Sequence, residues 1–292
     1  MQKRYFTYLF CCFLSLYSCA AYGQSGAWDN PKTKGKKARA AVTKKISGIK
    51  KLRDHIKQWG LEENYNRELL VGGRLNSNGW SGGVYFLKKN KPGNYHLWQL
   101  HFSEIKHEKQ VKEQVTKNPY PELGETTPFV FGKINNLYTL QLGYGKEQLL
   151  LPNVIEGNVS VCFRWNMGFS LAMLKPYYER LVRIDNTQVN PTPQLSEEKY
   201  SDNNADLFLK SGSTLGASKW RKGLNEIQYV PGIYVDAAFV IKPFPKKGFV
   251  EAITLGANAA IYSKPLPVMA EVKAYNYQVS LFAGLAIGKR WW

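Results

Sequence analysis

Long apolar runs are missing from this 292-residue sequence after its first 23 residues. A helix that crosses a bilayer needs about 20 predominantly apolar residues, and no later segment supplies as many as about 18 in succession. Helical membrane spans are therefore excluded. If the remaining chain enters a membrane, it must do so as a closed barrel, because open sheet edges leave backbone groups unpaired in lipid.

Cysteine and catalytic motifs are also scarce. Cys11, Cys12 and Cys19 lie in the first 23 residues, so Cys162 is the single cysteine in the rest of the sequence. This excludes an intramolecular disulfide and a cysteine metal cluster in the processed chain. The sequence contains no HExxH and no GxxxxGK. We therefore predict a protein that is not an enzyme, with no catalytic residue, no cofactor and no metal site.

The first 23 residues have the pattern of a secretory signal. A basic start precedes an apolar run over residues 5–17, and small residues precede a predicted cleavage after Gly23. Lipidation of Cys19 is an alternative, although the bulky Tyr17 fits a lipoprotein cleavage box poorly. We predict three parts: a signal peptide (1–23), a basic periplasmic extension (24–66) and a barrel (67–292).

Positive charge dominates the sequence and is concentrated in the extension. The net charge is +18, and between Lys32 and Lys57 eleven Lys or Arg accompany a single acidic residue, Asp54. Apolar residues at three- and four-residue steps predict a short basic amphipathic helix over 46–59. In an exported protein, such a helix is expected to meet anionic lipid or an acidic protein surface rather than nucleic acid. The alternative is a solvated helix that rests on the rim of the barrel.

The last stretch, residues 275–292, alternates with period two. Tyr275, Tyr277 and the following odd-numbered residues are mainly apolar, and the residues between them are mostly small or polar. The run is long, has aromatic residues at both ends and finishes on Trp291 and Trp292. These features are typical of a strand that crosses an outer membrane between two aromatic girdles.

Further strand-like segments predict an all-β, antiparallel transmembrane β-barrel of ten strands. The expected strands are 67–76, 80–88, 94–104, 128–134, 137–145, 157–166, 169–178, 225–242, 249–263 and 275–292. A count of eight is the alternative, if 128–145 is one bent strand or the first hairpin packs elsewhere. The long connections 105–127 and 179–223 fall on the side of the 77–79 turn, which predicts that both termini are periplasmic.

Period two also predicts which polar residues face the barrel lumen. A barrel of this size is narrow enough for side chains to fill. We expect a plug in which Arg74 or Arg164 pairs with Asp236, because buried charges need partners. A narrow solute channel lined by the same residues is the alternative. The expected inward set is Arg74, Arg164, Glu226, Gln228, Asp236, Glu251, Asn258 and Gln278.

The four histidines give little sign of catalysis. His55 falls in the basic helix, His96 on the predicted lipid face and His101 on the inward face. Ser103, His107 and Glu108 could supply a Ser–His–carboxylate arrangement, which leaves a lipid-modifying enzyme as a further alternative. Three neighbouring polar residues at a loop edge are, however, far more often solvated surface.

Several segments resemble small outer-membrane β-barrel proteins of Bacteroidota-type bacteria. They are the cleavage context at Gln24, Tyr-Gly-Lys at 144–146, Lys-Pro-Tyr-Tyr at 175–178 and the closing Gly-Lys-Arg-Trp-Trp at 288–292. The resemblance covers roughly 67–292 and implies a non-enzymatic accessory subunit of an outer-membrane assembly or secretion machine. Outer-membrane lipids and other envelope proteins would be its partners. It transfers no catalytic residue, and the extension 28–60 has no counterpart in it.

Overall fold

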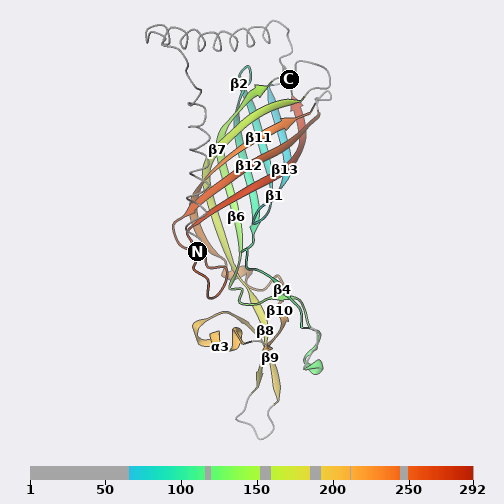
Figure 1. Ribbon diagram of the computed structural model, residues 1–292, viewed down its shortest axis with the longest axis vertical. Helices are drawn as coiled ribbons and strands as arrows, with labels where there is room; N and C mark the ends of the chain where they lie inside the picture. The colour runs from blue at the N-terminus through green and yellow to red at the C-terminus, as the bar shows by residue number, and fades with distance from the viewer. Residues whose placement is uncertain are drawn as a thin grey trace, which may run out of the picture. The chain divides into compact units, whose positions relative to one another are not determined.

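The computed structural model shows a closed antiparallel β-barrel of eight strands (Figure 1). It describes residues 66–115, 120–151, 159–184, 192–210, 212–243 and 249–291. Neighbours around the barrel follow the order β1-β13-β12-β11-β7-β6-β3-β2. The barrel strands are β1 (Arg67–Asn76), β2 (Gly79–Lys91), β3 (Asn94–Ile105), β6 (Asn135–Leu151), β7 (Ser160–Pro176), β11 (Gln228–Lys242), β12 (Phe249–Tyr262) and β13 (Tyr277–Trp291).

The expected all-β antiparallel barrel is confirmed, but the expected count of ten strands is wrong. The expected strands 157–166 and 169–178 are replaced by the single strand β7, which runs without a break from Ser160 to Pro176. Segment 128–134 contains only β5 (Phe129–Val130), which pairs with β4 (Lys112–Glu113) outside the barrel. The alternative count of eight is therefore the observed one, although neither of the reasons considered for it applies.

Gly168 explains why β7 continues where a turn was expected. This glycine pairs with Gly143 of β6, and the two backbones approach closely. A Cβ on Gly168 would lie 2.1 Å from the Leu142 carbonyl oxygen. The glycine therefore permits close strand packing, which is a regular role for glycine inside a strand.

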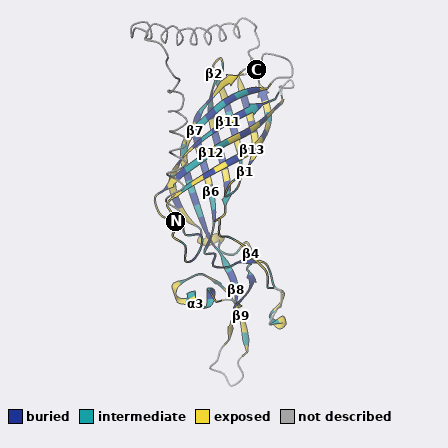
Figure 2. Cartoon of the chain, in the orientation of Figure 1, coloured by how far each residue is buried: buried dark blue, intermediate teal, exposed yellow. Residues whose placement is uncertain are grey.

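Side chains alternate strictly along β13, as the sequence predicts (Figure 2). Val279, Leu281 and Leu285 point outward and are 64–68% exposed, whereas Phe282 and Ala286 are buried inside. The other barrel strands also place apolar residues outside, among them Phe169, Ile233 and Leu142 in β7, β11 and β6. An apolar outer wall surrounding polar interior positions is the arrangement of a membrane barrel rather than of a soluble one.

The long connections lie at one end of the barrel, here called the loop end, which carries the 77–78 turn. Arg67 and Trp291 pair at the opposite, terminal end. Trp80, Phe102 and Tyr138 form a row of aromatic contacts across β2, β3 and β6 near the loop end. This row has the position of an interfacial girdle.

The described residues of the 179–223 stretch do not form the irregular segment that the sequence suggested. They belong to a folded loop-end module with a three-stranded antiparallel sheet in the order β10-β8-β9. Phe208 and Leu215 are fully buried in this module, which gives it an apolar centre of its own. Its elements are β8 (Tyr178–Ile184), β9 (Pro193–Lys199), η3 (Asp202–Asn204), α3 (Ala205–Phe208) and β10 (Thr214–Ala217).

Two further connections cover the mouth of the barrel at the loop end. Ala270 N–H donates to Gly132 O, and Ile134 N–H donates to Val268 O. Leu266 and Val268 are buried in the same apolar cluster as Leu137. The β12–β13 connection therefore lies across the mouth rather than extending away from it. Helix η2 (Pro121–Leu123) lies in the β3–β6 connection, and η4 (Leu224–Glu226) lies between β10 of the module and β11.

Several sequence predictions lie outside the described residues. These are the signal peptide with Cys19, the basic helix 46–59 with His55, and Trp292. Among the described residues, no helix is both long enough and apolar enough to span a bilayer.

Candidate functional site

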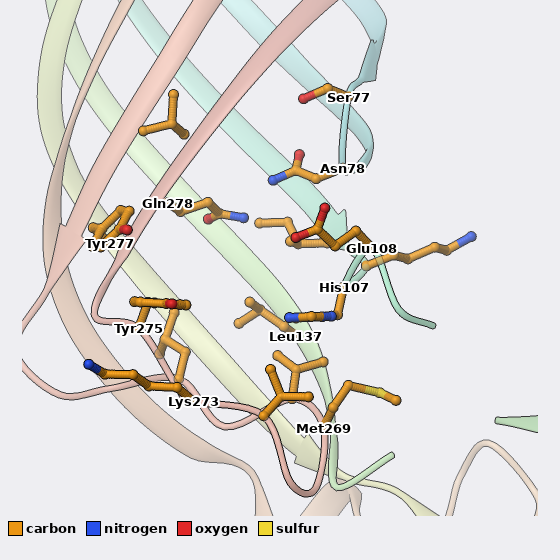
Figure 3. A pocket seen from close by; sticks show the side chains of 16 residues that line it. Ser77, Asn78, His107, Glu108, Leu137, Met269, Lys273, Tyr275, Tyr277 and Gln278 are labelled. Carbon is orange, nitrogen blue, oxygen red and sulfur yellow. The ribbon is translucent and has the colours of Figure 1, made fainter. Parts of the chain in front are cut away.

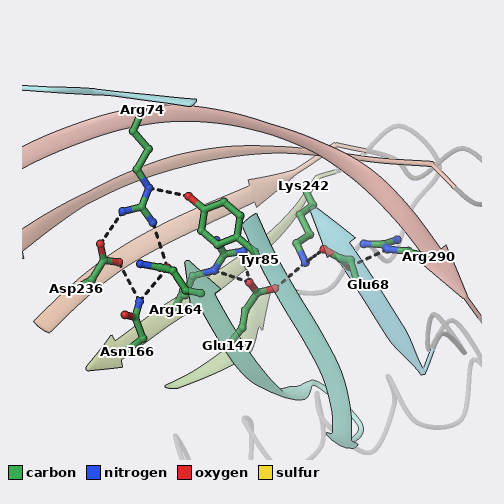
Figure 4. Close-up of polar contacts among 10 residues, drawn as sticks. Glu68, Arg74, Tyr85, Glu147, Arg164, Asn166, Asp236, Lys242 and Arg290 are labelled. Atoms are coloured by element: carbon green, nitrogen blue, oxygen red, sulfur yellow. Dashed lines mark hydrogen bonds and ion pairs between the residues drawn. The ribbon is translucent and has the colours of Figure 1, made fainter. Parts of the chain in front are cut away.

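The barrel lumen is filled by charged and amide side chains from several strands (Figure 4). Arg74 of β1 and Asp236 of β11 form the expected ion pair, with 2.6 Å between Nη1 and Oδ2. The Asn166 amide donates to Asp236 Oδ1 at 3.2 Å, and the Asn258 amide donates to Oδ2 at 3.4 Å. Arg74 Nε also donates to the Tyr85 hydroxyl at 2.8 Å. The carboxylate of Asp236 is therefore compensated by both charge and hydrogen bonds.

A second group of ion pairs lies toward the terminal end. Lys242 Nζ lies 2.8 Å from Glu68 Oε1 and 2.6 Å from Glu147 Oε1, so it joins the two carboxylates. Arg164 donates to Glu147 through Nε and Nη2, at 2.9 and 2.6 Å. Arg290 Nε lies 3.0 Å from Glu68 Oε2. This group is called the terminal-end network; it contains three cations and two carboxylates.

Tyr85 connects the two groups. Its ring lies 4.7 Å from the Arg164 guanidinium carbon and 5.4 Å from that of Arg74. Arg74 also stacks over the Phe282 ring at 4.0 Å. Cations held over aromatic faces gain electrostatic stabilisation, which is larger when water is excluded. Arg74, Arg164 and Asp236 are 0–4% exposed, so the two groups form a plug rather than the wall of an open pore.

Five of the eight residues expected to face the lumen lie on its inner face. Arg74, Arg164, Asp236, Asn258 and Gln278 have the predicted orientation. Arg164 pairs with Glu147 rather than with Asp236, so only the first of the two expected pairings forms.

Three residues were assigned wrongly. Glu251 is exposed on the outside, because β12 pairs with β13 without a bulge and residues 251 and 258 therefore face opposite sides. Glu226 precedes β11, lies in η4 and pairs with Lys199. Gln228 is the first residue of β11 and is exposed.

The terminal-end network contains four residues that the sequence reasoning missed: Glu68, Glu147, Lys242 and Arg290. Glu68, Lys242 and Arg290 lie within expected strands, and period two applied to the strand ends would have assigned them to the inner face. Glu147 lies beyond the expected strand end at 145, because β6 extends to Leu151.

Within the described part of the chain, His96, His101 and His107 and the proposed serine arrangement do not form a catalytic group. Ser103 is buried on the inner face of β3, and His107 lies after the strand has ended. The hydrogen bond found at the His107 ring is accepted from the Lys109 backbone N–H at 3.2 Å. His101 is inside, edge-on to Tyr85 at 4.9 Å, while His96 stacks on Tyr144 on the outer wall. Within the described ranges, no group of three or more His, Cys, Asp or Glu could hold a metal.

The loop end contains two cavities that share Asn78, Ile105 and Gln278. The inner one has a volume of about 20 Å³ and is polar; Arg74, His101 and Thr139 are part of its lining. It has room for about one water molecule. The outer one, here called the rim cavity, has a volume of about 450 Å³ (Figure 3). Its lining comes from the 77–78 turn, residues 105–108, Leu137, the β12–β13 connection and the start of β13.

The loop-end module contains a partly exposed ion pair and a buried carboxyl group, whereas the ion pairs of the lumen are fully buried. Arg183 and Glu198 form a bidentate pair at 2.5 and 2.8 Å. Hydrogen bonding from Arg183 is the main cause that lowers the pKa of Glu198 to about 2. Glu179 lies opposite Glu198 on β8. Burial raises the pKa of Glu179 to about 8, opposed by the hydrogen bond from Thr214 and reinforced by the charge of Glu113.

The comparisons with known proteins identify likenesses of fold. Crystal structures of Neisserial surface protein A and of Ail, the attachment invasion locus protein of Yersinia pestis, each share 7% identity with this chain, with TM-scores of 0.35 and 0.34. Each match covers 77% of this chain, and 96% and 97% of those chains. That Ail structure is a complex with the heparin analogue sucrose octasulfate.

The N-terminal β-barrel domain of Pseudomonas aeruginosa OprF shares 10% identity at a TM-score of 0.30, over 78% of this chain and 98% of that one. No family model and no curated protein matches the sequence. These identities and TM-scores are too low to transfer a function or a site. This chain's own residues form the architecture of a small outer-membrane β-barrel.

Proposed function

We propose that this chain is an integral outer-membrane barrel that anchors its loop-end module as a non-enzymatic subunit of an envelope complex. The observation that supports this best is the filled lumen, in which buried ion pairs occupy the space that a solute would need. A barrel of eight strands is just wide enough for such side chains. The alternative of a narrow channel finds no support in this interior.

The outer wall supports placement in a membrane. Outward residues such as Phe169, Leu281 and Leu285 are 66–76% exposed. Monomeric soluble proteins rarely expose contiguous apolar surface of this extent. In the proposed orientation both termini are periplasmic and the loop end faces the cell exterior, as in other barrels with short turns on the terminal side.

The loop-end module supports a role in assembly. Ile184 and Leu195 are 49% and 37% exposed at neighbouring positions of the β8–β9 hairpin. Exposed apolar residues on a folded, projecting hairpin are suited to packing against another protein. The sequence resemblance implies that the partners are proteins of the outer-membrane assembly or secretion machinery.

Gentle detergent extraction followed by chemical cross-linking and mass spectrometry tests this proposal. We expect stoichiometric envelope partners to cross-link to the module, and the Ile184→Ser/Leu195→Ser variant to lose them. Lys210→Ser, at an exposed residue of the same module, is the matched control. A protein that remains a clean monomer in every detergent would contradict the assembly role. Conductance across a planar bilayer would favour the channel instead.

A further inference from the structure

The barrel wall has a gap beside the rim cavity. Strand β1 ends at Asn76, which pairs with Phe282 of β13. The 77–78 turn adds two hydrogen bonds at Leu281: Ser77 N–H donates to Leu281 O at 2.8 Å, and Leu281 N–H donates to Ser77 Oγ at 3.2 Å. Strand β13, however, begins at Tyr277 and is paired with β12 from that residue onward. Residues 277–280 therefore have a strand neighbour on one side only.

The short β1–β2 hairpin produces this gap. On its other side the hairpin is level with β3, because Gly79 of β2 pairs with Ile105, the last residue of β3. The wall at this hairpin is therefore lower than at β13, which extends beyond β1. Figure 3 shows Ser77 and Asn78 on one side of the cavity and Tyr277 and Gln278 on the other.

The gap connects the rim cavity with the apolar outer wall. Tyr277 and Val279 line the cavity and are 54% and 64% exposed on the outer face of β13. The same face continues along the strand to Leu281 and Leu285. A molecule that lies against this wall in the membrane could therefore reach the cavity sideways, without passing through water.

The cavity lining combines an apolar floor with a basic edge. Leu137, Leu266 and Val268 are buried and provide apolar surface. Lys106 and His107 contribute from the end of β3, Lys273 contributes from the β12–β13 connection, and Glu108 is the single carboxylate in the lining. A volume of about 450 Å³ lies within the range of small-molecule sites.

The surroundings of the cavity are basic as well. Lys133, behind the covering connection, is held over the Tyr177 ring at 5.3 Å. Its pKa is lowered to about 8 by burial, with the charge of Glu104 opposing this and those of Lys106, Lys112 and Lys175 adding to it. An anionic group at the edge would relieve this repulsion between neighbouring cations.

We propose that the rim cavity binds an acyl chain of an anionic amphiphile that enters laterally from the membrane, with its headgroup held by Lys106 and Lys273. The chain contacts Leu137, Leu266 and Val268. Phosphate and carboxylate headgroups both satisfy this chemistry, because a lysine ammonium binds either as a point charge. The proposal requires that the barrel spans a membrane, but it requires neither a protein partner nor an assembly role.

Photolabelling of the full chain in phosphatidylcholine vesicles tests this site, with a diazirine-bearing hexadecanoic acid as the probe. We expect saturable labelling of residues 105–108 and 266–273 that is displaced by dodecyl phosphate. The corresponding diazirine-bearing alcohol should label the same residues about fivefold less, since it lacks the charge that the lysines bind. Labelling of Leu281 and Leu285 by either probe reports membrane insertion, so failure of the site is distinguishable from failure of insertion.

Matched variants separate the cavity from the general lipid surface. Val272→Trp fills the cavity and should abolish rim labelling, whereas Leu255→Trp on the outer wall should not. Lys106→Gln/Lys273→Gln should reduce labelling about fivefold. Lys264→Gln, at an exposed lysine of the same connection outside the lining, should leave it unchanged. Unheated gel mobility shows that each variant is folded. Non-saturable labelling confined to the outer wall, or equal rim labelling by acid and alcohol, would overturn the proposal.

Discussion

The lumen and the loop-end module use the same types of ion pair in opposite environments. The side chains of Glu147 and Arg164 in the lumen are 0% exposed, whereas those of Lys199 in the module and of Glu226 in η4, which pairs with it, are 50% and 44% exposed. Buried pairs must repay the loss of hydration, so removal of one partner leaves an uncompensated charge. Exposed pairs are already solvated and contribute little. The comparison shows that burial, rather than the number of ion pairs, decides which charges hold this protein together.

The largest effect is expected from Glu147→Ala. This change leaves Arg164 and Lys242 without their shared carboxylate in the buried interior. We expect it to lower the free energy of unfolding by about 3–5 kcal/mol. Guanidinium titration, followed by the gel mobility of folded and unfolded forms, measures this. An unfolding midpoint equal to that of the wild type would show that water, rather than protein, compensates these charges.

A smaller loss is expected when the pair is removed together. Glu147→Met/Arg164→Met deletes one charge of each sign and leaves Lys242 with Glu68. Because buried pairs are often replaceable by apolar residues, we expect a loss of roughly 1–2 kcal/mol, well below the sum of the two single changes. A double-mutant cycle gives the coupling energy. Additive single-variant effects would show that the two side chains do not depend on one another.

In the module, the ionisation of Glu179 is expected to make stability depend on pH. Its folded pKa is raised to about 8, so the folded state binds a proton that the unfolded state releases. Stability contributed at this position therefore falls as pH rises from about 4.5 to 8 and is constant above that range. Glu179→Gln should remove this dependence and slow proteolysis of the module at pH 8 by at least about threefold.

The ratio of variant to wild-type cleavage rates, measured between pH 5 and 9, corrects for the protease's own pH profile. Glu198→Gln is the informative control. Glu198 has a pKa lowered to about 2, so its contribution is present above about pH 4.5 and is lost only as pH falls through 2. A cleavage ratio for Glu179→Gln that is flat across the range would contradict the buried state of this carboxyl.

The smallest effect is expected from Glu226→Ala. Its partner Lys199 remains solvated when the pair is lost. We expect less than about 1 kcal/mol, diminished further by added salt. The same guanidinium titration as for Glu147→Ala makes the comparison direct. Equal losses for the two variants would remove the distinction between lumen and module.

The alternation of side chains made much of the barrel predictable from the sequence. Period two correctly placed Leu281 outside, and Arg74 and Asp236 inside, because a barrel strand has one face toward each environment. The number of strands could not be predicted from this alternation. Gly168 is a close-contact position in β7, but locally it has the same composition as a turn.

Prediction of the candidate sites from sequence was limited by tertiary contacts. Glu147 belongs to the lumen only because β6 extends beyond the expected end, and that extension depends on pairing with β7. The rim cavity arises from the unequal lengths of β1 and β13 and from the connection that crosses the mouth. Neither strand length nor loop position follows from local propensity.

A membrane-spanning barrel requires that the outward face of β13 contacts lipid. In vesicles, a nitroxide spin label can be placed at one position per variant, and its collision rates with oxygen and with a water-soluble nickel chelate can be measured. The positions are Val279, Leu281, Ala283, Leu285 and Ile287. We expect oxygen to dominate at all five positions and most strongly at Ala283, with Lys210 of the module accessible mainly to the chelate. Equal access of the chelate to the β13 positions and to Lys210 would contradict a membrane-spanning barrel.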